Sequence, residues 1–197
     1  MNDTRPITLF FGGLKHCGKT THALKFANAK KYDFIDIDRE IEKLYQLQNG
    51  KEYSCRQIYK KEGKKQFHQL EYEALLNYLE TSSNSKRVQI VSLGGGICDN
   101  QRALTVLKES GYFIYLYQEE AVLFKRMKAK GLPPYLGILN PKKKFHKIFE
   151  ARNFIYSQIA VLTITSPNLS KEETQEIIAS KLEEFIKQIQ KNKRNKK

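Results

Sequence analysis

The chain has 197 residues, of which 40% are hydrophobic and 28% charged, a balance typical of a soluble globular protein with one domain. No run of 18 apolar residues occurs, which argues against a membrane-spanning helix. Three separated cysteines indicate reduced thiols in a cytoplasm rather than a disulfide framework. The formal net charge of +14 fits a lysine-rich surface or a nucleic-acid partner, and the lack of a recognisable motif that reads RNA or DNA favours the surface.

Apolar runs alternate with segments of helical periodicity along the chain. The run at 7–11 predicts a buried strand that ends at two glycines, and a helix is expected from residue 18 to about residue 28. The elements expected after them are a strand at 32–38, a helix at 62–80 and strands at 87–93, 112–117 and 160–165. Strands separated by helices predict an α/β fold with a parallel sheet covered on both faces.

Two later segments depart from this alternation. Residues 128–142 hold three prolines and two glycines and predict a long loop, of the kind that forms a lid over an active site. The last seven residues, "KNKRNKK", contain five basic side chains and no acid, which predicts a disordered tail. We therefore expect one domain over residues 1–190, with its lid at about 128–142, and a basic tail over 191–197.

The stretch "GLKHCGKTT" fits the phosphate-binding pattern G-x-x-x-x-G-K-[ST], and it lies between the first strand and the first helix, as that motif requires. Backbone N–H groups of residues 14–19 would surround the β-phosphate of ATP at the positive end of the helix. Lys19 would bridge the β- and γ-phosphate oxygens, and Thr20 would hold Mg²⁺. The residues predicted to bind the nucleotide here are Gly13, Gly18, Lys19, Thr20 and Thr21.

Two carboxylates, Asp36 and Asp38, end the second predicted strand. A strand would place both on one face, in the crevice beside the phosphate loop. One could then hold Mg²⁺ while the other orients an acceptor hydroxyl and takes its proton. The alternative is a strand-end pair that caps the next helix, and the nearby phosphate loop favours the chemical interpretation.

The stretch "SLGGG" at 92–96 ends the third predicted strand. Three successive glycines permit close approach of the backbone and leave N–H groups available to an anion. Ser92 is placed to support the Mg²⁺ ligands. A plain tight turn is the alternative, although such a turn seldom needs three glycines.

Taken in order, "GLKHCGKTT", "FIDIDREIE", "SCRQIYKKEGKKQFHQLE", "SLGGG" and "EARNFIYSQIA" resemble the shikimate kinases over residues 7–190. The resemblance implies a three-layer P-loop kinase fold with a five-stranded parallel sheet in the order 2-3-1-4-5, flanked by helices. It also implies transfer of the ATP γ-phosphate to the 3-hydroxyl of shikimate, with Mg²⁺, in aromatic amino acid biosynthesis.

The resemblance assigns roles to single residues. Asp36 matches the acid near Mg²⁺, Asp38 the acid that binds the acceptor hydroxyls and acts as base, and Arg152 the arginine that clamps the substrate carboxylate. Arg126 matches a basic residue near the adenine and the lid. The remaining matches line or support the substrate pocket: Tyr59, Phe67, Glu71, Gly94, Gly95 and Gly96.

Two substrate-contacting arginines of the family are replaced, by His68 on the helix and by Pro133 in the lid. A cationic His68, Lys64, Lys128 or Lys130 could compensate, although lysine lacks the bidentate fork of arginine. The alternatives are a P-loop kinase for another small hydroxylated acceptor and a non-catalytic nucleotide-binding module. In each case we expect a cytoplasmic monomer that binds a small molecule, with no membrane or nucleic-acid partner.

Overall fold

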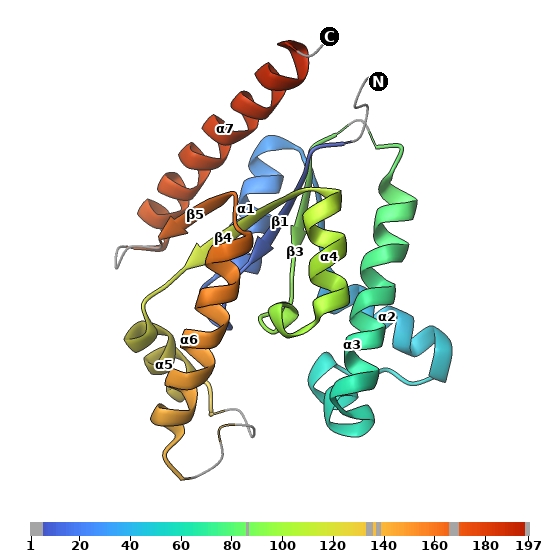
Figure 1. The fold of residues 1–197 in the computed structure, drawn as a ribbon, viewed down its shortest axis with the longest axis vertical. Helices are drawn as coiled ribbons and strands as arrows, with labels where there is room; N and C mark the ends of the chain where they lie inside the picture. Colours follow the sequence, from blue (N-terminus) through green and yellow to red (C-terminus); the bar gives the residue numbers. More distant parts are fainter. Residues whose placement is uncertain (1–5, 86, 133–135, 137–138, 166–169, 196–197) are drawn as a thin grey trace.

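The computed structural model describes residues 6–85, 87–132, 136, 139–165 and 170–195. Its centre is a parallel sheet of five strands in the order β2-β3-β1-β4-β5 (Figure 1). The strands are β1 (Thr8–Gly12), β2 (Asp33–Asp36), β3 (Gln89–Ser92), β4 (Tyr112–Tyr117) and β5 (Leu162–Thr165). The predicted fold class and strand order are therefore confirmed.

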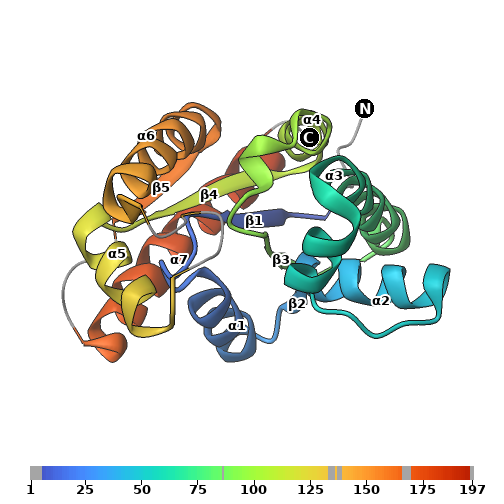
Figure 2. The same cartoon turned by 90° about the horizontal axis from the view of Figure 1, so that it is seen from below.

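Helices cover both faces of the sheet. Figure 2 shows α1 and α7 on one face and α4 and α6 on the other, with α3 beside α4. The helices are α1 (Lys19–Lys30), α2 (Ile37–Asn49), α3 (Cys55–Ser82), α4 (Gln101–Ser110), α5 (Glu120–Ala129), α6 (Pro141–Ile159) and α7 (Lys171–Asn195). A short 3-10 helix, η1 (Ile97–Asp99), precedes α4. None of the helices that the structure describes is long and apolar enough to cross a bilayer.

The two central strands explain why the sheet needs two helical layers. All five residues of β1 are buried, and the four inner residues of β4 are buried as well. A parallel strand that is covered on both faces is apolar along its whole length rather than at alternate positions. Burial of these two strands therefore fixes the centre of the sheet, and the residues of any functional site must come from the strand ends and helices around it.

The second predicted strand is shorter than expected. It stops at Asp36, whose carboxylate accepts a hydrogen bond from the backbone N–H of Asp38 at 3.1 Å and so caps α2. Asp38 consequently lies in the first turn of α2, and the prediction that a strand places both carboxylates on one face was wrong. The local cause is Asp36 itself, because aspartate is a preferred N-cap residue, and the acids Asp38 and Glu40 in the first turn suit the positive end of a helix.

The helix expected at 62–80 begins seven residues earlier, at Cys55. Ser54 and Gln57 form a reciprocal capping box, which starts the helix at that point. Gly63 interrupts it with φ 78° and ψ 176°, a conformation that glycine adopts at little cost. Thus α3 consists of two segments, residues 55–62 and residues 64–82.

The C-terminal tail was predicted to be disordered from residue 191, and this was wrong for residues 191–195, which continue α7. Ile186 and Ile189 are buried on the preceding turns, so the helix is already held when the basic stretch begins. Lysine and arginine are good helix formers and are favoured at the negative end of the helix dipole. Positive charge alone was therefore a poor indicator of disorder.

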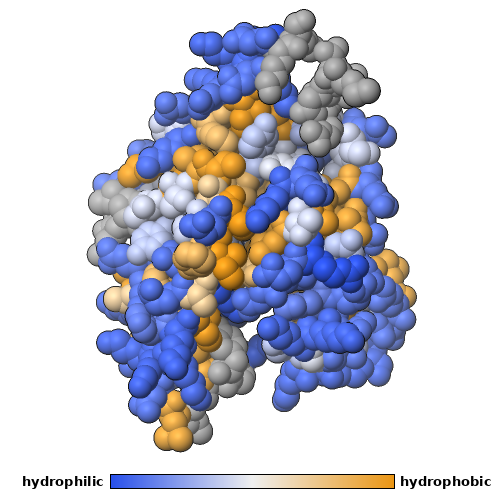
Figure 3. Space-filling model, viewed as in Figure 1, coloured by the Kyte–Doolittle hydropathy of each residue, from blue (hydrophilic) through white to orange (hydrophobic). Residues whose placement is uncertain are grey.

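The predicted lid is bounded by α5, which ends at Ala129, and α6, which begins at Pro141. Pro133 lies outside the described residues, so its substitution for an arginine stays a sequence observation. Figure 3 shows a notch at the lower edge of the molecule, between the lower parts of α5 and α6 on one side and those of α2 and α3 on the other. The side formed by α2 and α3 has a largely hydrophilic surface, whereas hydrophobic residues also reach the surface on the other side.

Candidate active site

The phosphate loop joins β1 to α1, as the sequence predicts. Gly13 is buried directly after β1, and Gly18 is the N-cap of α1 with φ 94°, a left-handed conformation that favours glycine. Lys19 is only 9% exposed although it carries a charge. Thr20 and Thr21 follow in the first turn of α1 and are exposed. The loop therefore has the conformation and the positive helix end that suit a phosphate.

Three oxygen-bearing side chains meet beside this loop. The Thr20 hydroxyl lies 2.8 Å from the Ser92 hydroxyl, and Ser92 ends β3 directly opposite Asp36 at the end of β2. Burial raises the pKa of the Asp36 carboxyl, and a hydrogen bond from the Thr20 side chain opposes that rise. Hydroxyl and carboxylate oxygens are the ligands that Mg²⁺ prefers. The donor set thus fits the predicted metal, with Ser92 beside the two predicted ligands.

The two carboxylates of this region are electrostatically coupled to Lys19. Burial raises the pKa of both Asp36 and Asp38, and the positive charge of Lys19 opposes the rise in each. The Asp36 charge further raises the pKa of Asp38. Asp36 also caps α2 while it lies next to the metal donors, so the capping and chemical interpretations are compatible.

The three glycines after β3 bring the phosphate loop and the acceptor side of the site together. A side chain at Gly95 would come within 3.0 Å of the backbone nitrogen of Lys15, so the turn can pack against the loop only as glycine. A Cβ atom at Gly94 would lie 2.8 Å from Asp38 Oδ1 and 3.4 Å from Glu71 Oε1. Asp38 and Glu71 therefore face this turn from α2 and α3.

Glu71 is a buried acid at 2% exposure. Asn100 Nδ2 donates a hydrogen bond of 2.9 Å to Glu71 Oε2 and a second of 2.8 Å to the carbonyl of His68. Burial raises the pKa of Glu71 to about 7, and the negative charge of Asp38 adds to this effect. The family resemblance in the sequence indicated Glu71 but not Asn100, whose side chain also caps α4.

Arg152 reaches the same turn from α6. Its Nη1 donates to the Gly95 carbonyl at 3.0 Å, and the Tyr156 hydroxyl donates to the same oxygen at 3.1 Å. Its Nη2 forms an ion pair of 2.8 Å with Oδ2 of Asp99, which ends η1. Sequence reasoning missed Asp99, and an acid three residues after the last glycine was the available indication.

A family model described as shikimate kinase matches residues 15–187. The chain belongs to the shikimate kinase family. A shikimate kinase from Chlorobium phaeobacteroides strain DSM 266 is 31% identical, with 95% of this chain and 97% of that protein covered. A shikimate kinase from Chlorobaculum parvum is 30% identical over 93% of this chain and 96% of its own length. Membership makes the protein an ATP-dependent kinase.

Solved structures agree on the fold. The shikimate kinase from Acinetobacter baumannii in complex with shikimate has a TM-score of 0.74 and 24% identity, with 93% of this chain and 94% of that chain covered. The shikimate kinase from Aquifex aeolicus has a TM-score of 0.66 and 26% identity, with 91% and 98% covered. The three-layer fold with strand order 2-3-1-4-5 is therefore that of the shikimate kinases.

This shikimate kinase has an unusual acceptor side at His68. The side chain is half-buried, and burial lowers its pKa, with Lys64 and Arg152 adding to the decrease and Asp99 opposing it. The hypothesis that a cationic His68 replaces the missing arginine is therefore not supported at neutral pH, because desolvation outweighs the carboxylate. His68 remains a predicted substrate contact as a neutral donor or acceptor.

The predicted aromatic wall lies next to His68 on α3. Tyr59 and Phe67 meet edge to face, with ring centroids 5.5 Å apart, although they belong to the two different segments of this helix. Tyr59 is 46% exposed, so it has surface available to an acceptor. Their role as pocket walls stays a prediction.

The basic residues at the end of α5 and the start of the predicted lid have different surroundings. Arg126 Nη1 donates to the carbonyl of His16 at 3.0 Å and ties α5 to the phosphate loop. Burial lowers the pKa of His16, and the charges of Lys15 and Lys130 add to the decrease. Lys128 lines a cavity of about 700 Å³ between α5 and the start of α6, together with Glu120 and His146. Compensation for the missing arginines by Lys128 or Lys130 stays a prediction.

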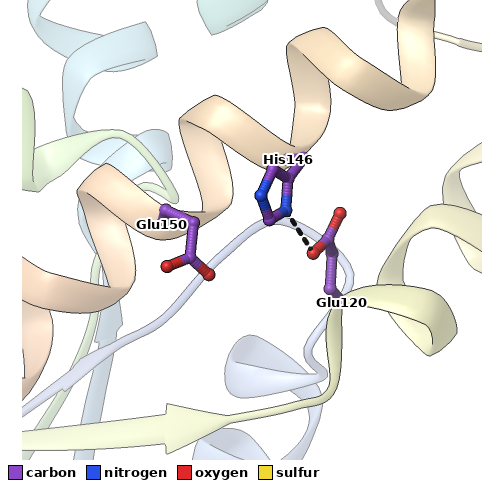
Figure 4. A group of neighbouring side chains, drawn as sticks. All are labelled: Glu120, His146 and Glu150. Atoms are coloured by element: carbon purple, nitrogen blue, oxygen red, sulfur yellow. Dashed lines mark hydrogen bonds and ion pairs between the residues drawn. The ribbon is translucent and has the colours of Figure 1, made fainter.

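A second polar cluster lies at the α5–α6 contact. His146 Nδ1 lies 2.9 Å from Glu120 Oε2, and Glu150 points toward the same space from the next turn of α6 (Figure 4). Among the described residues, these three form a His/carboxylate group whose ligand atoms all lie within 4.8 Å of one another. His146 and Glu150 are exposed, and the group shares no residue with the predicted kinase site.

Proposed function

We propose that this protein transfers the γ-phosphate of ATP to the 3-hydroxyl of shikimate. The observation that carries the proposal is the arrangement around the glycine turn. Asp38 faces the turn at Gly94, whereas Arg152 faces it at Gly96, where a Cβ atom would lie 3.4 Å from Nη2. A small ring between these side chains could offer a hydroxyl to the carboxylate and a carboxylate to the guanidinium.

Asp38 is the residue proposed to orient the acceptor hydroxyl and to accept its proton. Its carboxyl is half-buried, and burial raises its pKa. The charge of Lys19 opposes that rise and so favours the ionised form that a base requires. As the hydroxyl oxygen bonds to the γ-phosphorus, the bond from that phosphorus to the β–γ bridging oxygen breaks, ADP leaves with the bridging oxygen, and the hydroxyl proton passes to an Asp38 oxygen. Arg152 holds the far end of the acceptor, so its contribution is positioning of the reacting hydroxyl.

ATP and Mg²⁺ are proposed to occupy the phosphate-loop side. Backbone N–H groups of the loop and Lys19 would bind the phosphates, and Thr20 and Asp36 would hold the metal, supported by Ser92. Mg²⁺, when bound, neutralises phosphate charge. Arg126 is proposed to border the adenine, because it lies against the loop from α5. We also propose a cytoplasmic monomer, with the small-molecule substrates as its partners.

A second candidate is a P-loop kinase for a small polyol without a carboxylate. The specific observation in its favour is that Arg152 already forms an ion pair with Asp99. In addition, burial lowers the pKa of His68, which favours the neutral imidazole. Because two arginines of the family are also replaced, less positive charge faces an acceptor carboxylate than the family pattern implies.

The deciding experiment is a coupled assay of ADP release with MgATP, first alone and then with shikimate. The proposed function predicts strong stimulation at sub-millimolar shikimate. Absence of stimulation, with MgATP binding intact by calorimetry, would contradict it and favour the second candidate, which a panel of polyols and sugar acids would then test.

A further inference from the structure

Asp99 and Arg152 form an ion pair on the acceptor side. Their side chains are 31% and 20% exposed, so the pair is partly withdrawn from water. Among the described residues, the other Asp99 oxygen accepts from the weak thiol donor of Cys98, at 3.7 Å. The guanidinium of Arg152 is therefore the stronger of the two donors that orient this carboxylate.

The charge of Asp99 extends to the other residues of this region. It raises the pKa of Glu71 and opposes the decrease at His68, whereas Arg152 acts in the opposite direction on both. The pair therefore contributes little net charge to this region of the site. An acceptor carboxylate that approaches Arg152 meets a guanidinium that is already neutralised.

We propose that Asp99 competes with the acceptor carboxylate for Arg152 and is a specificity-determining residue of this enzyme. This inference rests on the proposed function, since it takes shikimate as the acceptor. Binding of a carboxylated acceptor displaces Asp99 from Nη2, while the bond from Nη1 to the Gly95 carbonyl keeps Arg152 in position. A neutral acceptor leaves the Asp99–Arg152 pair intact, so Asp99 reduces the preference for carboxylated over neutral acceptors.

The test is Asp99→Asn, which removes the charge but keeps the size of the side chain and an oxygen that can accept from Arg152. The KM for shikimate is expected to fall about tenfold or more, because the acceptor then gains the charge-assisted bond to Arg152 without competition. The kcat should change less than about twofold on this argument, since no reacting atom is touched. The KM for shikimate methyl ester, which carries no charge, should not follow the decrease.

Asp33→Asn provides the matched control. It removes the same charge from an exposed pair with Arg87 at the amino end of β2 and should leave both KM values unchanged. An unchanged or increased KM for shikimate in Asp99→Asn would overturn the proposal. So would an equal change for the acid and the ester, because that pattern indicates a purely structural role.

Two further outcomes keep the inference separate from the proposed function and from folding. If the wild-type enzyme does not phosphorylate shikimate, the proposed function is contradicted. In that case the inference about Asp99 is supported only if Asp99→Asn gains shikimate kinase activity, and it is refuted if the variant stays inactive. If Asp99→Asn does not fold, calorimetry on the wild-type enzyme with ADP decides. If the Kd for shikimate methyl ester is less than about ten times the Kd for shikimate, competition between Asp99 and the acceptor carboxylate is supported. A ratio of about one hundred or more refutes that competition.

Discussion

The nucleotide side and the acceptor side of this site differ in how they are built. On the nucleotide side, Lys19, Thr20 and Asp36 keep the family pattern, and their positions follow from backbone features: a left-handed Gly18, strand register and a helix N-terminus. On the acceptor side, the contacts are side chains from α3, η1 and α6. A single substitution there changes charge without changing the fold, so acceptor recognition can vary while the phosphate chemistry is kept.

Asp38→Asn is expected to have the largest effect, because it acts where the two sides meet. The variant should lose about a thousandfold or more in kcat through loss of the base, with ADP affinity nearly unchanged. Steady-state kinetics and ADP titration calorimetry would measure the two quantities. Glu40→Gln, which removes a charge from a half-buried side chain on the same helix, is the control. Near-normal turnover in Asp38→Asn would show that the assigned base is wrong.

Arg152→Ala should affect the acceptor side alone. The KM for shikimate is expected to rise about ten- to a hundredfold while the KM for ATP stays unchanged, since one charge-assisted contact is lost. The variant also leaves Asp99 without its ion-pair partner and should be destabilised by on the order of 1–3 kcal/mol.

The double variant Arg152→Ala/Asp99→Asn separates these two effects. Removal of the unpaired charge should restore much of the free energy of unfolding in urea, but it should not restore the KM. A double variant that recovered the KM for shikimate would contradict the role of Arg152 in acceptor binding.

Glu71 gives the acceptor side a pH dependence of stability. Its pKa is raised to about 7 in the folded protein by burial, above the ordinary value of 4.5. Between these pH values the folded state therefore holds more protons than the unfolded state, and stability falls as pH rises through this window, by about 1–3 kcal/mol. Urea unfolding at pH 5 and pH 8 measures the difference.

Glu71→Gln should remove most of that slope, because glutamine does not ionise and its oxygen can still accept from Asn100. An unchanged slope in Glu71→Gln would assign the pH dependence to other groups. Turnover of the variant reports separately on whether the charge of this acid matters to the acceptor.

The smallest effect is expected at the exposed α5–α6 contact, which contrasts with the buried acids. The hydrogen bond to Glu120 raises the pKa of His146 above 6.5 (Figure 4). The stabilisation from protonated His146 beside Glu120 is therefore present at pH 6.5 and is lost as the pH rises through the pKa of His146 in the folded protein. NMR titration should show this shift, and Glu120→Gln should return the pKa toward its ordinary value. An unshifted His146 in the wild-type protein would refute the contact.

The sequence predicts the fold well because the signals are local. Continuous apolar runs mark β1 and β4, and the phosphate-loop spacing fixes the β1–α1 junction. The position of Asp38 was wrong because a helix-capping signal at Asp36 competed with a strand pattern, and the capping signal prevailed. Whether His68 is cationic or neutral also could not be predicted from the sequence, because desolvation depends on how the folded site packs around the side chain.

The pairing of Asp99 with Arg152 could not be predicted from the sequence for a different reason. Arg152 is 53 residues away from Asp99 and on another helix, so no spacing rule relates the two. The same holds for Asn100 and Glu71, which are 29 residues apart. Motifs predict residues that act through adjacent backbone, whereas pairs that meet only in the tertiary structure stay hidden until the fold is known.

The interruption at Gly63 lets one helix serve two neighbours. A helix keeps its direction because each hydrogen bond spans four residues, and a residue at φ 78° and ψ 176° breaks that continuity. Residues 55–62, which carry Tyr59, are held on α2, where the Cys55 N–H donates to Glu42 at 3.0 Å and the Tyr45 hydroxyl donates to Glu62 at 2.7 Å. Residues 64–82, which carry His68 and Glu71, pack on α4. A single glycine conformation thus joins the helix that carries Asp38 to the segment that carries Glu71.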